Sequence, residues 1–570
     1  MADIGQAASS SSPGLAQLAA CHLSNSERDL RQVVDKKFGL TLPVKMTRLE
    51  KAAGVVYAGE IHCLALKDWA QMIIDYNLAH MLVGLRQSDP KRQRGILVEF
   101  WRRYRACKPE HSMWDLVDSG ELDLETCYPM MLHGDEGRGR KKSGFLVVTY
   151  SSYMGLGTNE ANTKRERRHY LSMKLNYTGS PFCHRYLTAV LPKMFKDEQA
   201  LESILSFVAD DSAFMLRTGV TNTRGDVLKM CVLQNTGDWQ WLAKSGHLMR
   251  SYANVEKRPR TEKSLPKGIC HLCLAGQRGI PWENFRCDAV PIWWPTRFSQ
   301  SPFEGMVSLL RIPHVMAAPE SFFCYDLFHI YHLGVGKTWT ASCLALMSDR
   351  LSASSIDERF EEMTLTFLQY CAEHRKVGYL TTITKSTLGW PDRGQFPNGQ
   401  WSKGSVSVLM GSFFEHWASK QDLRNDEMLS LCRSVNQLID RCMRMLYERD
   451  LWLTREDAAF ISDLALQFLD GYRRLAKMAF DNRRNLFSLM PKAHAFEEIF
   501  YEMKALLLQK PDLRYVMSPL AHAVQISEDY VGRCSRVSRR TGPAQVVLRT
   551  LQRNLESGYS HYHDMGYLRD

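Results

Sequence analysis

The sequence predicts an α/β protein with a mixed β-sheet core, a zinc-type loop and a large helical insertion, preceded by a helical N-terminal region. Two observations lead to this prediction. Segments rich in β-branched and aromatic residues cluster between residues 127 and 239, and long patterns with helical periodicity occur on both sides of them. The 570 residues, 45% apolar and 24% charged, have the composition of a globular protein of several domains, which excludes a mostly disordered chain.

The N-terminal part is predicted to be helical after a disordered tail. Residues 1–25 are small and polar, whereas residues 26–120 show apolar–polar periodicity, as in LALKDWAQMIIDYNLAHMLVGL. No basic segment precedes an apolar core near residue 1, and no apolar stretch of about 18 residues occurs. We therefore expect neither a secretory leader nor a membrane span, and a location in the cytoplasm or nucleus.

Residues 121–255 are predicted to form the first part of the sheet core. Three strand-like segments, YPMMLHGDEG, SGFLVVTYSSY and HYLSMKLNY, are joined by loops, and residues 186–208 have a helical pattern. A fourth strand is expected in DVLKMCVLQNTGDW. Three strands, a helix and a further strand are the start of an α/β layer.

The rest of the chain divides into three parts. Residues 256–345 are irregular and hold the zinc-type loop, and residues 346–480 are predicted to be a helical insertion with amphipathic patterns such as SIDERFEEMTLTFLQYCAEH. Residues 481–570 are expected to open with a helix, complete the core and end in a basic segment.

Asp135 and Asp238 are the first candidate site residues. Each follows a glycine at the point where a strand-like segment ends. Because the ends of neighbouring strands can meet at one edge of a sheet, the two carboxylates could lie close together, and such pairs usually hold divalent cations. Mg²⁺ or Mn²⁺ at this position would suit phosphodiester chemistry. The alternative is that each aspartate only begins a turn.

The sequence CHLC, with Cys270 and Cys273, has the spacing of one half of a tetrahedral zinc site. No second pair of this kind occurs, so the remaining ligands must come from elsewhere. His494 and Glu498 are the first candidates, because residues four apart share one face of a helix. The rival ligands are His329, His332 and Cys287. The alternative is a pair of buried free thiols.

Asp326 and His329 are spaced to share a helix face in YDLFHIYHLGVGKTW, where they could bind a ligand together or form a surface pair. The tail GVGKT resembles a phosphate-binding loop. That motif requires a glycine at position 331, where this chain has a tyrosine. We therefore expect Gly334 and Gly336 to allow a close backbone approach instead.

Glu528 is a further carboxylate candidate, beside Asp529 at the head of a predicted helix. The chain from Tyr530 to Asn554 contains arginines and no acid, which suits a phosphate-binding surface, although a solvated basic helix is the alternative. The net charge of +11 permits a polyanionic partner. The basic residues expected to contact nucleic-acid phosphates are Arg138, Arg140, Lys141, Lys142, Lys164, Arg165, Arg167, Arg168, Arg533, Arg536, Arg539 and Arg540.

Taken in order, LHGDEG, LQNTGDWQWL, CHLC, YDLFHIYHLGV, PKAHAFEE and SEDYVGRCSRVSRR resemble the motifs of DDE-type transposases of cut-and-paste transposons, near the CACTA-like and related groups. The resemblance covers residues 120–555 in motifs rather than continuously. It implies an RNase H-like fold in which the first acid ends the first strand, the second ends the fourth, and a glutamate on a late helix is the third. The matching residues are Asp135, Asp238 and Glu528.

The resemblance also implies a function. It implies Mg²⁺- or Mn²⁺-dependent cleavage and transfer of double-stranded DNA strands, a structural Zn²⁺ and a nuclear location, while the sequence leaves open whether the protein is a monomer or a homo-oligomer. The zinc site of the family is completed by histidines on a late helix; His494 matches one of them, and Glu498 stands where a second is expected. Asp326 remains an alternative second acid, with Asp238 as the first, although the order of the predicted strands favours Asp135 and Asp238.

Two other functions remain open. A catalytically inactive, domesticated zinc-containing DNA-binding or scaffold protein is favoured by Glu498 and by the lack of a recognisable DNA-binding module near the N-terminus. A nucleotide enzyme built on GVGKT is disfavoured by Tyr331.

Overall fold

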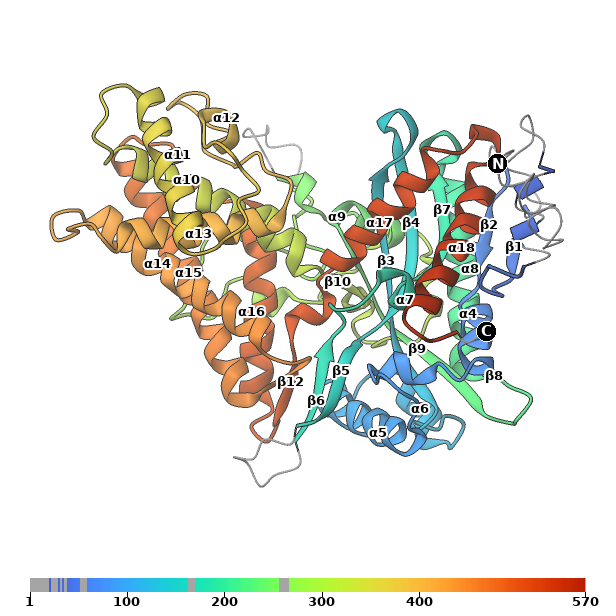
Figure 1. Ribbon diagram of the computed structural model, residues 1–570. Coiled ribbons are helices and arrows are strands. Elements are labelled where there is room, and N and C mark those ends of the chain that lie inside the picture. The colour runs from blue at the N-terminus through green and yellow to red at the C-terminus, as the bar shows by residue number, and fades with distance from the viewer. Residues whose placement is uncertain are drawn as a thin grey trace.

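The chain forms a sheet with helices on both faces and, beside it, a bundle of helices (Figure 1). This structure is a computed structural model, and it describes residues 20–21, 29–30, 33–34, 38–51, 59–161, 170–255 and 266–568. The predicted tail, residues 1–25, lies almost entirely outside the described residues. None of the described helices combines the length and the apolar character needed to cross a membrane.

The main sheet has eight strands in the order β1-β2-β7-β4-β3-β9-β10, with β8 paired to β9. β4 is antiparallel to both β3 and β7, whereas β9 is parallel to both β3 and β10. The carboxyl ends of β3, β9 and β10 therefore meet at the same edge. The strands are β1 (Met46–Arg48), β2 (His62–Leu64), β3 (Cys127–Arg138), β4 (Gly144–Ser152), β7 (Tyr186–Pro192), β8 (Val220–Thr221), β9 (Val227–Gly237) and β10 (Phe323–Tyr325).

Helices cover both faces of this sheet. α4 and α8 contact each other and the strands β7 and β9 on one face, while α17 contacts β3 and α18 contacts β7 on the other. α8 begins at Asp197, whose carboxylate accepts a hydrogen bond from the backbone N–H of Ala200 (2.7 Å), and it buries an apolar stripe against the sheet. The helices of this part are α4 (Leu66–Asp75), α5 (Pro90–Cys107), α6 (Met113–Asp118), α7 (Pro181–His184), α8 (Glu198–Arg217), α9 (Trp239–Ser245), α17 (Gln525–Ser538) and α18 (Val546–Asp564).

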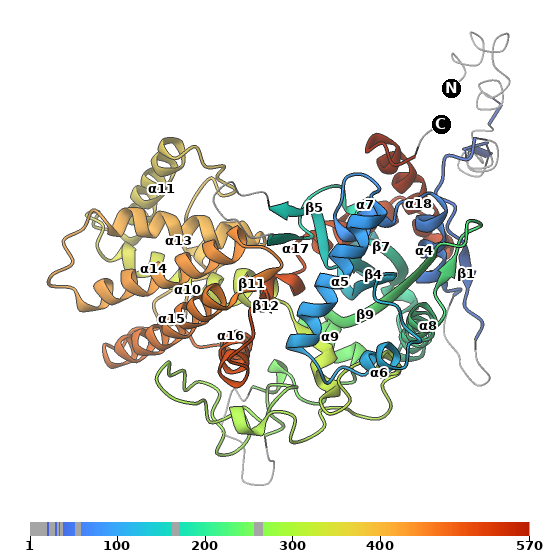
Figure 2. The same ribbon diagram turned by 90° about the horizontal axis from the view of Figure 1, so that it is seen from below.

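The helical bundle lies between β10 and α17 in the sequence, and Figure 2 shows it beside the sheet. Trp339 of α10 is buried at its centre, where its ring contacts those of Phe468 and Tyr472. The bundle contains α10 (Gly336–Ser348), α11 (Ile356–Glu373), α12 (Lys385–Leu388), α13 (Gly404–Ala418), α14 (Glu427–Glu448), α15 (Arg455–Asp481), α16 (Pro491–Gln509) and the strand pair β11 (Trp452–Thr454) and β12 (Tyr515–Met517).

The predicted mixed α/β class is confirmed, but several local predictions were wrong. Residues 186–192, expected to be helical, form β7; all seven are buried, and a short apolar run buried on both faces cannot be told from a helix by periodicity. The segment HYLSMKLNY instead supplies β6 (Tyr170–Leu175), which pairs with β5 (Met154–Ala161) outside the main sheet. Two short strands, β1 and β2, also occur in the region expected to be helical.

Candidate active site and metal centre

Four carboxylates meet at the edge of the sheet where β3, β9 and β10 end. Asp135 lies near the end of β3, Asp238 follows β9 directly, and Asp326 follows β10. Glu528 lies on α17 at the same edge, and its carboxyl group is hydrogen-bonded to that of Asp135. The charges of Asp238 and Asp326 both act on Asp135. The structure thus brings together residues that are almost 400 positions apart in the sequence.

The glycines before the two aspartates make room for one aromatic ring. A Cβ atom on Gly134 or Gly237 would collide with the indole of Trp241. Trp241 is buried in α9, and its Nε1 donates to the Asn235 side chain (2.8 Å). Asp238 is the N-cap of the same helix, because its Oδ1 accepts a hydrogen bond from the Trp241 backbone N–H (2.7 Å). The Gly-Asp pattern therefore anchors α9 beside the strand ends.

The electrostatics of this cluster favour a cation. Burial and the charge of Asp238 raise the pKa of Asp135 to about 6, and burial together with the charge of Asp135 raises the pKa of Glu528 well above its usual range. Burial opposes a charge on His329, but the hydrogen bond and charge of Asp326 prevail and raise its pKa to about 9. An imidazolium thus offsets part of the negative charge in the absence of a metal.

Asp326 differs from the other acids because the protein already satisfies its oxygens. They accept hydrogen bonds from the backbone N–H groups of Phe328 (2.8 Å) and Val524 (3.2 Å) and lie 2.5 Å from Nδ1 of His329. Nε2 of His329 lies 3.7 Å from Oε1 of Glu528. Asp326 therefore orients His329 and the start of α17. The predicted alternative role of Asp326 as an acid of the triad has less support from this geometry.

His329 also connects the carboxylate cluster to α16 of the helical bundle. It lies in the π-helical segment η10 (Phe328–Val335), and its backbone carbonyl accepts a hydrogen bond from Lys492 Nζ (2.8 Å) on α16. A Cβ atom on Gly334 would collide with the Lys492 side chain, and one on Gly336 with the ring of Tyr331. The close approach predicted for the GVGKT segment is therefore confirmed, and Gly336 begins the buried helix α10.

Replacement of Asp135 by asparagine should stabilise the metal-free protein. The pKa of Asp135 in the folded state lies above its usual value, so the wild-type protein loses stability as the pH rises from about 4 through 6. Asp135→Asn removes this loss, and above pH 6 it should raise the free energy of unfolding by about 1–3 kcal/mol. Thermal unfolding in EDTA across this pH range measures the difference.

The control is Asp118→Asn, at an aspartate whose side chain is 57% exposed and paired with Arg105. This change should stay within about 0.5 kcal/mol at every pH. If the stability of wild type and Asp135→Asn depends on pH in the same way, the raised pKa of Asp135 in the carboxylate cluster is contradicted.

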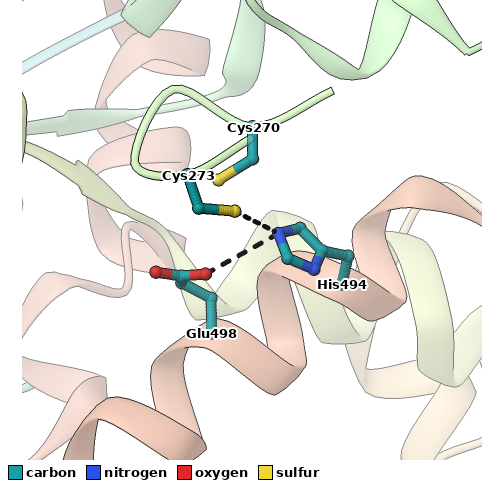
Figure 3. A group of neighbouring side chains, drawn as sticks. All are labelled: Cys270, Cys273, His494 and Glu498. Carbon is teal, nitrogen blue, oxygen red and sulfur yellow. Dashed lines mark hydrogen bonds and ion pairs between the residues drawn. The ribbon is translucent and has the colours of Figure 1, made fainter. Parts of the chain in front are cut away.

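A second group, the metal centre, consists of Cys270, Cys273, His494 and Glu498 (Figure 3). All four are buried, and their ligand atoms lie within 4.8 Å of one another. Sγ of Cys273 lies 3.3 Å from Nε2 of His494, which lies 3.6 Å from Oε2 of Glu498. The two cysteines come from a loop and the other two residues from adjacent turns of α16, as the four-residue spacing predicted.

These residues could hold a metal ion such as zinc. Ligands about 2.0–2.3 Å from a tetrahedral centre lie roughly 3.3–3.8 Å apart, a range that includes the distances from His494 Nε2 to Cys273 Sγ and to Glu498 Oε2. Oε2 of Glu498 accepts no hydrogen bond from the described residues. Burial raises the pKa of Glu498 to about 8, although the Arg297 guanidinium opposes this. A divalent cation would offset the cost of burying this carboxylate beside a thiolate.

Neighbouring side chains fix the ligands of the metal centre. Nε of Arg297 lies 2.6 Å from Oε1 of Glu498, and another nitrogen of the guanidinium lies 2.9 Å from Glu502. The ring of Trp293 meets His494 edge to face at 4.8 Å between centroids. Such contacts around the ligands orient them for a metal.

The rival zinc ligands lie elsewhere. His329 belongs to the carboxylate cluster, and Nε2 of His332 is hydrogen-bonded to Tyr447 (2.8 Å). Cys287 is not part of the group that the described residues form. The prediction of His329 as a zinc ligand was therefore wrong. The local sequence around a histidine does not show which residues far away in the chain will contact it.

Part of the predicted basic surface lies at the turn that follows β3, the strand that carries Asp135. Arg138, Arg140, Lys141 and Lys142, at the turn between β3 and β4, line one cavity with Arg539 of α17. The Arg539 guanidinium donates two hydrogen bonds to the Arg138 carbonyl (2.7 and 2.9 Å). Arg536 and Arg540 are also exposed, while Arg533 pairs with Asp529 (2.9 Å). Lys164, Arg165, Arg167 and Arg168 lie outside the described residues.

Sequence reasoning missed three charged residues next to the carboxylates. Lys196 and Lys244 both contact Glu136, the neighbour of Asp135. Burial and the proximity of Lys244 lower the pKa of Lys196 to about 8. No local pattern marks these lysines, because each belongs to a different element and only the fold brings them together.

The comparisons with known proteins leave the family open. No protein-family model matches the chain, and the search of curated proteins finds no match.

Proposed function

We propose that this protein is a DDE-type transposase or related endonuclease, derived from a cut-and-paste transposon, that cleaves and transfers DNA strands with Mg²⁺ or Mn²⁺. The observation that carries the proposal is the convergence of Asp135, Asp238 and Glu528 at one edge of the sheet. Neighbouring carboxylates whose mutual repulsion raises their pKa values are a typical binding site for divalent cations.

The topology supports the finer assignment to an RNase H-like fold. Five central strands follow the chain order β3, β4, β7, β9 and β10, with α8 between the third and the fourth. Asp135 lies near the end of the first of these strands, Asp238 follows the fourth, and Glu528 lies on a later helix. This arrangement agrees with the resemblance in the sequence.

The three carboxylates would bind the cations and set their positions. When bound, divalent cations supply Lewis-acid stabilisation of the scissile phosphate and lower the pKa of the attacking water or 3′-hydroxyl. Asp238 is held in place as the cap of α9, and Glu528 is held on the rigid helix α17. His329, oriented by Asp326, would help to fix the side chain of Glu528, since its Nε2 lies 3.7 Å from Oε1 of Glu528.

The substrate would approach along the basic turn between β3 and β4. Arg140, Lys141 and Lys142 carry no counter-ion within the described ion pairs, and Arg539 extends the same positive surface. Contacts of this kind go to phosphates and carry no sequence preference by themselves. They suit the phosphate backbone of double-stranded DNA.

The metal centre would act as a structural zinc site. It joins the loop at Cys270 and Cys273 to α16, and it contains no ligand exposed to solvent. Such closed sites stabilise the fold rather than take part in chemistry.

The proposal is tested by incubating supercoiled plasmid with the full-length protein and Mg²⁺ or Mn²⁺, with EDTA as the negative condition. Nicking that needs the metal supports the proposal. Salt-dependent DNA binding without nicking would instead favour the inactive DNA-binding or scaffold protein. The N-cap role of Asp238 favours that second candidate, because it gives this aspartate a structural reason to be present.

A further inference from the structure

Two lysines meet at a single glutamate beside the carboxylate cluster. Lys196 follows β7, and Lys244 lies on α9. Oε1 of Glu136 accepts from Nζ of Lys244 (3.0 Å) and from Nζ of Lys196. The three residues therefore come from three different elements and are gathered only by the fold.

The lysines line the same small cavity as the acids, a space of about 10 Å³ that would hold about one water molecule. That cavity is lined by Asp135 and Asp238 together with Glu136, Lys196 and Lys244. The side chains of Lys196 and Lys244 are 19% and 43% exposed, so both can be reached by solvent but neither is fully hydrated. An anion that contacts the lysines would therefore lie next to the candidate metal ligands.

The charges of this group do not balance. Two ammonium groups share one carboxylate oxygen, and they lie close enough to act directly on each other. Lys196, Lys244 and Glu136 alone carry an excess of one positive charge, which the charge of Asp238 beside Lys196 offsets in part, and the two ammonium groups repel each other. A phosphate group offers several oxygens around one centre and would accept charge-assisted hydrogen bonds from both lysines with less crowding.

We propose that Lys196 and Lys244 form a phosphate clamp that binds a phosphodiester of the nucleic-acid strand entering the carboxylate cluster, and that Glu136 occupies the clamp when no strand is bound. The identity of the ligand rests on the proposed function. Binding would exchange the Glu136 carboxylate for a phosphate oxygen, with no covalent step. The clamp would position the strand while the acids hold the cations.

The clamp predicts opposite effects for the two kinds of variant. The double variant Lys196→Ala/Lys244→Ala should weaken the binding of a fluorescein-labelled DNA duplex about tenfold and reduce the slope of log affinity against log salt by about 1–2. Glu136→Gln, which removes the competing carboxylate, should tighten binding about two- to fivefold. Fluorescence anisotropy without added Mg²⁺ or Mn²⁺, over a series of KCl concentrations, measures both.

The matched controls lie on α15, where Lys477 pairs with Asp481 on the surface. Lys477→Ala and Asp481→Asn should leave duplex affinity unchanged, and thermal unfolding of every variant shows whether it is folded. If Glu136→Gln weakens binding as the lysine double variant does, the three residues form only a structural ion pair and the clamp is overturned. Unchanged affinity of the lysine variant would overturn it as well.

The outcomes also separate the clamp from the proposed function, because binding is measured without catalytic metal. Opposite shifts in affinity combined with no nicking would support the clamp and reject the nuclease. Nicking by the wild type with unchanged affinity of the lysine variant would do the reverse.

Discussion

Asp238→Asn is expected to reduce Mg²⁺- or Mn²⁺-dependent nicking of DNA by at least about 10³-fold. An asparagine keeps the size of the side chain and its ability to cap α9, so the hydrogen bond to the Trp241 N–H should remain. What is lost is one of the charges that would hold the cations against the repulsion of Asp135. The loss should therefore appear in activity and not as a decrease in the thermal stability of the protein, because the change also relieves the repulsion between Asp238 and Asp135. A plasmid-nicking time course together with a melting curve measures both.

A matched control is Asp89→Asn, which changes another aspartate that caps a helix. Asp89 accepts a hydrogen bond from the backbone N–H of Arg92 (3.1 Å) at the start of α5 and lies outside the carboxylate cluster. This variant should nick DNA at the wild-type rate. Persistent nicking by Asp238→Asn would refute the role given to Asp238.

Removal of the metal centre is expected to have the largest effect on stability. Cys273→Ala should abolish the binding of one zinc ion per chain and lower the free energy of unfolding by about 3–5 kcal/mol. The reason is that the free energy of metal binding would contribute directly to folding, and that without the metal His494 and Glu498 remain buried with Arg297 as their main charged partner. A chelator strong enough to extract zinc should have the same effect on the wild type. Metal analysis of the purified protein and thermal unfolding give the two readouts.

Cys442→Ala is the control, since Cys442 is buried in α14 and is not part of the metal centre. This change should cost about 1 kcal/mol and leave the zinc content unchanged. If the purified wild type carries no metal and its melting temperature does not respond to zinc or chelator, the four residues are only a buried hydrogen-bonded group.

Sequence patterns predicted the parts of the site that have a local signature. Asp135 and Asp238 each follow a glycine near the end of a strand. Both positions must be glycine because a Cβ atom at either would collide with the Trp241 ring. His494 and Glu498 were found together because a four-residue spacing places them on one helix face. In these cases a few neighbouring residues carry the geometric constraint.

Other features have no local signature. Residues 186–192 were assigned to a helix because a buried apolar run lacks any polar face that would reveal its period. β10 is only three residues long, so the strand before Asp326 could not be recognised from composition. The meeting of Lys196, Lys244 and Glu136 depends on the pairing of strands far apart in the chain, which no local pattern encodes.

α16 links the two centres mechanically. It carries His494 and Glu498, and two residues before His494 it carries Lys492, whose ammonium group donates a hydrogen bond to the backbone carbonyl of His329. Without zinc, the three acids would remain chemically intact. The backbone of His329, which helps to fix Glu528, would therefore be held less firmly. Under the proposed function, we expect zinc-free chains to cleave DNA poorly even before they unfold.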